Sequence, residues 1–368
     1  MTDLLWKTNW AETQERLLRW WEGRGLAVCL TAVRPQPRIA VPRPVRPGTL
    51  EATWLDPQYR CARAEYEMAH TEFLAEGFPH LDALIGPGSL GSILGADTRL
   101  AEDTVWYFPC IAEPEAFGAI RFRPENNRWL EAHLALIDEG LRRSQGRYLV
   151  GMPDLIENLD TLSALRGDMP LLYDLIERPG WVMDRLAEIN TAYTEVFEVF
   201  YQRIKAADGS HVFTAFNLWA PGRTAKVQCD LSANLSPRMF RRFVVPALTA
   251  QCAWLDYSMY HLDGTNAMQQ LDLLLEIELL RAIEWTPQAG RAGGGSAEWY
   301  ALYRRIKAAG KSVQVVGVED GELVPLLDAI GPQGVYVLMS DDPDRPRTLD
   351  QADRLLQAIE PYYSRSCS

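Results

Sequence analysis

The chain has 368 residues, 47% hydrophobic and 23% charged, so it can bury a large core and does not have a disordered composition. The formal net charge of -12 argues against a nucleic-acid or anionic-membrane partner, because both require a concentrated basic surface. No apolar run approaches the roughly 20 residues that span a bilayer, and the first residues do not have the pattern of a signal peptide. We therefore expect a soluble, cytoplasmic protein that binds a small molecule, with residues 1–368 forming one domain.

The first element expected is a helix within residues 1–24. Trp6, Trp10, Trp20 and Trp21 have helical spacing there, so the helix would pack against the rest of the chain or a partner subunit. Exposed tryptophans would need a partner to cover them. A homodimer is therefore expected.

Apolar segments then alternate with helical ones. Eight candidate strands occupy residues 26–32, 83–85, 148–152, 212–216, 258–262, 282–285, 313–316 and 335–339. Helical spacing marks residues 169–200, 237–255, 267–275, 297–309 and 323–329. This alternation indicates parallel strands with helices outside, and eight repeats predict an α/β fold closed into a (β/α)8 TIM barrel. An open, doubly wound sheet is the competing architecture, but no GxGxxG follows the first strand.

Two segments interrupt the alternation. Residues 35–47 hold five prolines and predict an extended loop over one end of the barrel. Residues 105–123 predict an inserted hairpin, in which residues 106–108 would pair with residues 119–122.

Polar and aromatic residues follow many of the candidate strands, where a barrel carries its active site. The set comprises Arg34, Pro87 with Ser89, Asp154, Trp219, His261 with Asp263, Trp285 with Gln288, Glu319 with Asp320, and Asp341. Each one alone could cap a helix or pack in the core. Together they predict a site.

His261 and Asp263 are the most informative pair. Residues two apart in a strand point to the same side, so an imidazole and a carboxylate would face one cleft, where they could bind a metal, move a proton or hold a substrate. The candidate catalytic residues are His261, Asp263, Asp154, Glu319 and Asp341. The candidate substrate-binding residues are Arg34, Trp219, Arg223, Trp285 and Gln288.

Several stretches resemble the uroporphyrinogen decarboxylase superfamily, which includes that decarboxylase and the corrinoid-protein methyltransferases. They are Gly86-Pro87-Gly88-Ser89-Leu90 through Ala96, Pro153-Asp154 through Asn158-Leu159-Asp160-Thr161-Leu162 and Leu165-Arg166-Gly167, Leu171-Leu172 through Arg178-Pro179, Ser236-Pro237 with Phe243-Val244-Val245-Pro246, and His261 to Gly264. The resemblance covers most of the chain from about residue 80 onward. It implies a (β/α)8 barrel and either methyl transfer or decarboxylation.

The departures from that family narrow the expected chemistry. The decarboxylase has an arginine-rich run after its first strand, whereas this chain has Thr31-Ala32-Val33-Arg34 and then prolines, so uroporphyrinogen is not expected as the substrate. The methyltransferases bind zinc through a His-x-Cys pair and a later cysteine, whereas this chain has His261-x-Asp263 and no cysteine near Asp341. Cys229 could be a substitute ligand. A histidine with carboxylates, as in His261 and Asp263, makes a harder ligand set that is compatible with zinc and also with manganese or iron.

Four functions follow as hypotheses. The first is corrinoid-linked methyl transfer, with a divalent metal at His261 and Asp263 and a corrinoid protein as partner. The second is decarboxylation of a small acid, with Arg34 or Arg223 holding the carboxylate and His261 or Asp154 handling the proton. The third is a carbohydrate-active enzyme in which Trp219 and Trp285 stack on a sugar between paired carboxylates. The fourth is a barrel that binds a metabolite without catalysis.

Overall fold

Thirteen strands are present in the computed structural model, which describes residues 4–366. They are β1 (Leu26–Val33), β2 (Thr71–Ala75), β3 (His80–Leu81), β4 (Asp97–Leu100), β5 (Val105–Phe108), β6 (Leu149–Met152), β7 (Ser210–Phe213), β8 (Leu218–Pro221), β9 (Thr224–Gln228), β10 (Tyr257–Asp263), β11 (Ala282–Thr286), β12 (Ser312–Val318) and β13 (Val335–Met339). A seven-stranded sheet has the order β2-β1-β13-β12-β11-β10-β9, and a four-stranded sheet has the order β3-β6-β7-β8. All neighbours in the larger sheet except β1 and β2 are parallel, so the fold is α/β with a mostly parallel central sheet.

The predicted closure into an eight-stranded barrel is not seen in the hydrogen-bonded ladders of residues 4–366. β2, which sequence reasoning missed, pairs antiparallel with the edge of β1 that a closed barrel would use for its next strand. β8 returns antiparallel to β7, so β7 and β9 belong to different sheets. The second strand was predicted at residues 83–85, but the strand that pairs with β6 is β3 at His80–Leu81.

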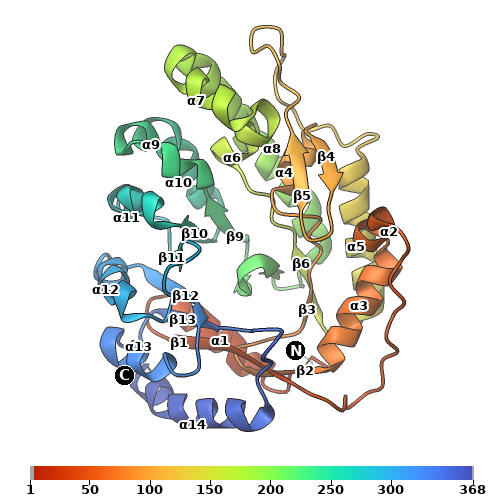
Figure 1. Cartoon of the computed structure of the whole chain (residues 1–368), viewed down its shortest axis with the longest axis vertical. Helices are drawn as coiled ribbons and strands as arrows, with labels where there is room; N and C mark the ends of the chain where they lie inside the picture. The colour runs from red at the N-terminus through yellow and green to blue at the C-terminus, as the bar shows by residue number, and fades with distance from the viewer. Residues whose placement is uncertain (1–3, 367–368) are drawn as a thin grey trace.

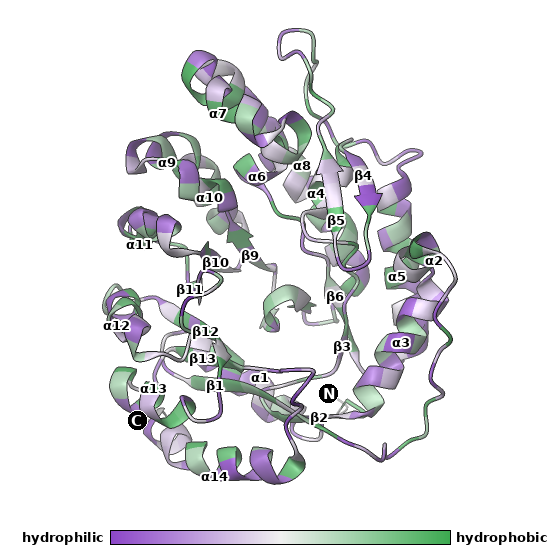
Figure 2. Ribbon diagram, in the orientation of Figure 1, coloured by the Kyte–Doolittle hydropathy of each residue, from purple (hydrophilic) through white to green (hydrophobic). Residues whose placement is uncertain are grey.

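Helices lie around the outside of the strands (Figure 1). They are α1 (Trp10–Trp21), α2 (Leu50–Leu55), α3 (Pro57–Ala69), α4 (Ser89–Ile93), α5 (Arg128–Ser144), α6 (Asn158–Arg166), α7 (Asp168–Glu177), α8 (Pro179–Ile204), α9 (Pro237–Phe243), α10 (Val245–Trp254), α11 (Leu271–Leu275), α12 (Tyr300–Ala308), α13 (Leu323–Ile330) and α14 (Leu349–Ser366). Short 3-10 helices are η1 (Thr214–Phe216), η2 (Asp230–Asn234), η3 (Thr265–Gln270) and η4 (Ala297–Trp299). Most helices carry both hydrophilic and hydrophobic residues, as expected when one face packs on the strands (Figure 2).

Proline divides two of the helices that the sequence predicts as continuous. The helix expected over residues 169–200 is α7 followed by α8, because Pro179 occupies the first position of a new helix, where its missing N–H is not needed. The helix expected over residues 237–255 is likewise α9 followed by α10, with a proline in the first turn of each. None of the helices within residues 4–366 has the length and apolar character needed to cross a membrane.

The N-terminal tryptophans are all buried within this chain. The Trp20 indole donates to the Val313 carbonyl at 3.1 Å and the Trp21 indole donates to the Trp219 carbonyl at 3.0 Å. Val313 is the second residue of β12, which begins at Ser312, so the contact from Trp20 places α1 at the amino-terminal end of that strand. These side chains therefore do not provide the exposed patch that would call for a partner, and the homodimer stays a prediction.

The two predicted interruptions have different outcomes. The proline-rich segment over residues 35–47 contains neither helix nor strand, as expected. A hairpin is present, but β5 pairs with β4, which precedes it, in the register Asp97 to Phe108 and Leu100 to Val105. Residues 119–122 form no strand, so the predicted hairpin over residues 105–123 was wrong in its partner.

Candidate metal centre

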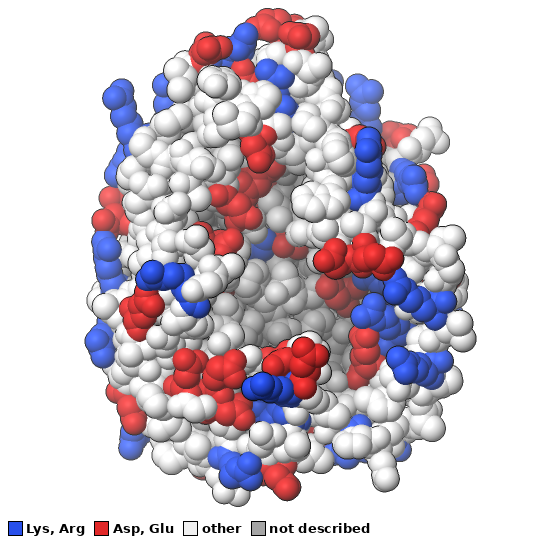
Figure 3. All heavy atoms as spheres, in the orientation of Figure 1, with Lys and Arg blue, Asp and Glu red and all other residues white. Residues whose placement is uncertain are grey.

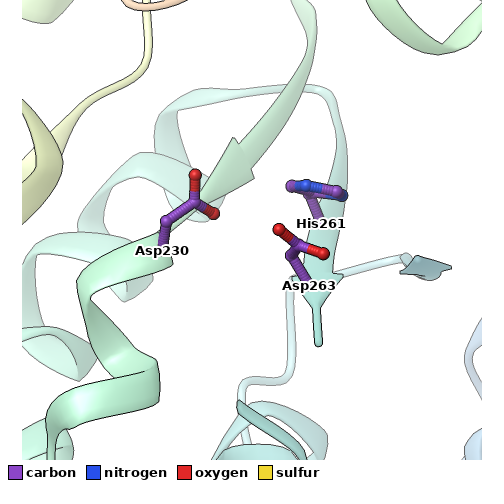
Figure 4. Close-up of side chains that lie close together, drawn as sticks. All are labelled: Asp230, His261 and Asp263. Carbon is purple, nitrogen blue, oxygen red and sulfur yellow. The ribbon is translucent and has the colours of Figure 1, made fainter. Parts of the chain in front are cut away.

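Asp230, His261 and Asp263 form a compact group at the carboxyl ends of β9 and β10. One potential ligand atom from each residue lies within 4.8 Å of the others. Figure 4 shows Asp230 extending from one segment toward the His261 and Asp263 pair on the neighbouring strand. The parallel register explains this meeting: Gln228 lies opposite His261, so Asp230, two residues further on, reaches the level of Asp263.

Glu284 holds the imidazole of His261. The two residues are opposite each other in the parallel pair β10 and β11, and Nδ1 of His261 contacts Oε2 of the buried Glu284 side chain. Thr286 donates to the other oxygen of Glu284 at 2.7 Å. Burial lowers the pKa of His261, but the charge and hydrogen bond of Glu284 outweigh it and raise the pKa overall. A carboxylate on Nδ1 leaves Nε2 as the ligand atom and increases its basicity.

Asp230 is fixed through both its backbone and its side chain. Its backbone N–H donates to Asp160 at 2.7 Å, and the Gln228 amide donates to Asp230 Oδ2 at 2.8 Å. Burial and the negative charge of Asp160 raise the pKa of Asp230 to about 6, with Asp263 adding to the repulsion. These crowded carboxylates are a favourable environment for a cation. One imidazole with two carboxylates fits a divalent metal, and the oxygen-rich set favours hard ions such as manganese or iron while remaining compatible with zinc.

A buried polar network lies next to this group, on and against β9. Lys226 and Asp154 form an ion pair at 2.8 Å, with both side chains almost fully buried. Glu157 accepts the backbone N–H of Gln228 at 2.8 Å. Burial raises the pKa of Glu157 to about 8, against the opposing effect of Lys226. Asp154, predicted as a catalytic residue, is therefore buried in an ion pair with Lys226 and is not part of the group of Asp230, His261 and Asp263.

Two predicted substrate-stacking residues are in the core. Trp285 is fully buried and packs against Trp299 with ring centroids 5.0 Å apart. Alternation along β11 turns Glu284 toward His261 and Trp285 to the opposite side. Trp219 is buried on β8 and packs edge-on against Trp10. Neither ring is available to a sugar, which corrects the prediction.

The two predicted arginines are engaged elsewhere. Arg34 pairs with Glu72 of β2. Arg223 pairs with Glu198 at 2.5 Å, and its carbonyl accepts the Asp256 N–H just before β10 begins. Because β8 reverses the chain direction, Arg223 lies at the amino-terminal end of β10. His261 and Asp263 lie at the other end of that strand, so Arg223 is far from them along the sheet.

The remaining predicted site residues lie outside the compact group. Gln288 and Glu319 are exposed, Gln288 accepts the Thr265 hydroxyl at 2.7 Å, and Asp341 accepts the Thr31 hydroxyl at 3.2 Å. Cys229 is buried, which raises its thiol pKa well above the usual range and disfavours the thiolate that binds metals. Within residues 4–366 the grouped ligand is its neighbour, Asp230, so the prediction was one residue away from the carboxylate that the structure brings to the group.

Sequence reasoning missed four important residues: Lys226, Gln228, Asp230 and Glu284. The first three recur at every second position in and just after β9, which is the signal of one strand face. β9 was not predicted because its polar residues resemble a loop. Glu284 lies within the strand predicted over residues 282–285. A glutamate in a buried strand needs a partner, and this was the signal that could have identified it.

Comparisons place the fold among known structures. The chain is similar to a methyltransferase from Methanosarcina mazei with a TM-score of 0.57 and 13% sequence identity, over 95% of this chain and 99% of that chain. At this identity the likeness shows a shared fold. No protein-family model matches the chain, and no curated protein matches it either.

Proposed function

We propose that this protein is a metal-dependent methyltransferase in which Asp230, His261 and Asp263 hold a divalent ion. The observation that carries the proposal is the convergence of these three side chains, with Glu284 fixing the imidazole. The fold shared with a methyltransferase over nearly the whole of both chains supports the reaction class. The resemblance to the uroporphyrinogen decarboxylase superfamily adds a corrinoid protein as the proposed methyl-carrying partner.

The residues have distinct parts in this mechanism. A bound divalent metal would act as a Lewis acid that favours the deprotonated form of a methyl acceptor. Glu284 keeps Nε2 of His261 turned toward the ligand position, and Gln228 with Asp160 keeps Asp230 in place before anything binds. The Lys226–Asp154 pair holds β9 against the segment after β6. Preformed ligands need little reorganisation when the metal enters.

The alternative reactions have less support. The decarboxylation hypothesis required Arg34 or Arg223 to hold the substrate carboxylate. Both guanidinium groups instead pair with carboxylates of the chain itself. The sugar hypothesis required Trp219 and Trp285, whose rings are buried. A metabolite-binding barrel without catalysis gives no reason for the buried network around Lys226, because buried charged groups are costly to keep.

Metal content is the direct test. We expect the purified protein, or protein incubated with zinc, manganese or iron(II), to retain close to one metal ion per chain by elemental mass spectrometry. Asp230→Asn, His261→Ala and Asp263→Asn should each lose most of it, whereas Asp341→Asn, a carboxylate at another strand end, should not. Methyl transfer from methylcobalamin to thiol, hydroxyl and amine acceptors would then be compared in the same proteins. A wild-type chain that retains none of these metals would contradict the proposal.

A further inference from the structure

A cleft adjoins the candidate metal centre. It has a volume of about 840 Å³, and Gln228 and Asp230 form part of its wall. The hairpin of β4 and β5 contributes Trp106 and Tyr107 to the lining, and the start of α7 contributes Met169. A volume of this size holds an organic molecule of moderate size. Any molecule in the cleft would lie beside one of the proposed metal ligands.

The lining is apolar, aromatic and acidic. Trp106 and Met169 are 61% and 59% exposed, which is unusual for side chains of this type and leaves them free to contact a ligand. The charged side chains in the lining are Asp160, Asp168 and Asp230, and the described lining contains no lysine, arginine or histidine. Figure 3 shows Asp and Glu side chains around the central hollow of this face, with several Lys and Arg side chains also at its rim. An anion in the cleft would find no positively charged side chain among the lining residues.

Two cationic side chains near the cleft have carboxylate partners of their own. Arg99 is opposite Trp106 in the hairpin, but its guanidinium pairs with Asp97 at 3.1 Å and lies over the Phe108 ring at 4.2 Å. Lys226 is buried below the centre and pairs with Asp154. Neither side chain lines the cleft.

We propose that this cleft binds an organic cation, a quaternary ammonium compound, between its aromatic wall and its aspartates. Aromatic faces attract ammonium groups through the ring quadrupole, and carboxylates add a longer-range attraction. The inference rests on the proposed function in that it assigns the substrate class of the same site. A neutral molecule of the same shape would gain the apolar contact and lose both attractions.

Isothermal titration calorimetry of the full chain tests this with three ligands of one shape: choline, its neutral carbon analogue 3,3-dimethylbutan-1-ol, and the anion 3,3-dimethylbutanoate. Phenyltrimethylammonium adds a larger cation suited to the volume. We expect the cations to bind at least about tenfold more tightly than the neutral analogue, and the anion more weakly still. Trp106→Leu should weaken choline binding several-fold. Tyr173→Leu, an equally exposed aromatic residue of α7 outside the lining, should leave it unchanged.

Three results would overturn the inference: equal binding of choline and its neutral analogue, tight binding of the anion, or no cation binding tighter than about 10 mM. An unchanged affinity in Trp106→Leu would also remove this cleft as the site. Metal content, measured on the same protein, separates the two proposals. Metal without cation binding would leave the proposed function standing, and cation binding without metal would remove the metal centre while keeping the cleft.

Discussion

The orientation of His261 depends on a single buried carboxylate. One oxygen of Glu284 contacts His261, and its second oxygen accepts the Thr286 hydroxyl. Such carboxylate-histidine pairs fix which ring nitrogen faces the metal. The sequence predicted that His261 and Asp263 lie on one side of a strand, because residues two apart in a strand point to the same side. It did not predict Glu284 and Asp230, because contacts between neighbouring strands depend on register.

Replacing Glu284 by glutamine tests this dependence. The amide keeps the size of the side chain but removes the charge that favours a basic Nε2, so metal affinity should fall about 10- to 100-fold. Competition with a chelator of known affinity would measure the change. Glu319→Gln makes the same chemical change at an exposed position outside the group and should bind metal like the wild type. Equal affinity in Glu284→Gln would show that His261 is held by other contacts.

At the level of elements, β9 accounts for most of the difference between the predicted and the observed site. A strand such as β13, with the sequence Val-Tyr-Val-Leu-Met, was predictable because it is a continuous apolar run. β9 has the sequence Thr-Ala-Lys-Val-Gln and is nevertheless buried at every position. The Gln228 amide donates to Asp160 of α6, and Lys226 pairs with Asp154 in the segment before α6. The sequence also did not predict that β8 pairs antiparallel with β7. Because of this reversal, Arg223 lies at the end of the sheet away from the candidate metal centre.

The stability of β9 should depend on the Lys226–Asp154 pair. Lys226→Met leaves the buried Asp154 carboxylate without its cation, and the loss of one member of a buried pair costs about 3–5 kcal/mol. Urea unfolding would measure the change in the free energy of unfolding. The double variant Lys226→Met with Asp154→Leu removes both charges and should be more stable than the single variant. If the single variant is the more stable of the two, the pair is not what holds this strand.

At the level of the whole molecule, side chains rather than a continuous ladder join the two larger sheets. The 3-10 helix η1 follows β7, and side chains of the larger sheet contact η1 and the residue after it. Gln314 of β12 donates to the Phe216 carbonyl at 2.9 Å, and Tyr336 of β13 donates to the Asn217 carbonyl at 2.9 Å. His211 of β7 accepts the backbone N–H of Thr224, the first residue of β9, at 2.9 Å. The junction between β7 and β9 thus depends on a neutral imidazole, because a protonated Nε2 cannot accept a hydrogen bond.

This junction should make the stability of the protein sensitive to acid. Burial lowers the pKa of His211 to about 4 in the folded chain, whereas an unfolded histidine titrates near 6.5. Between these values the unfolded chain binds the additional proton, so the contribution of His211 is complete above pH 6.5 and is lost as the pH falls toward 4. Its size is on the order of 2–3 kcal/mol. His211→Gln retains an acceptor for Thr224 without titrating, so its free energy of unfolding should fall less between pH 7 and pH 5 than that of the wild type. His70→Gln, at a partly exposed position, should follow the wild type. Identical pH profiles for wild type and His211→Gln would show that the sheets are joined in a way that does not depend on this proton.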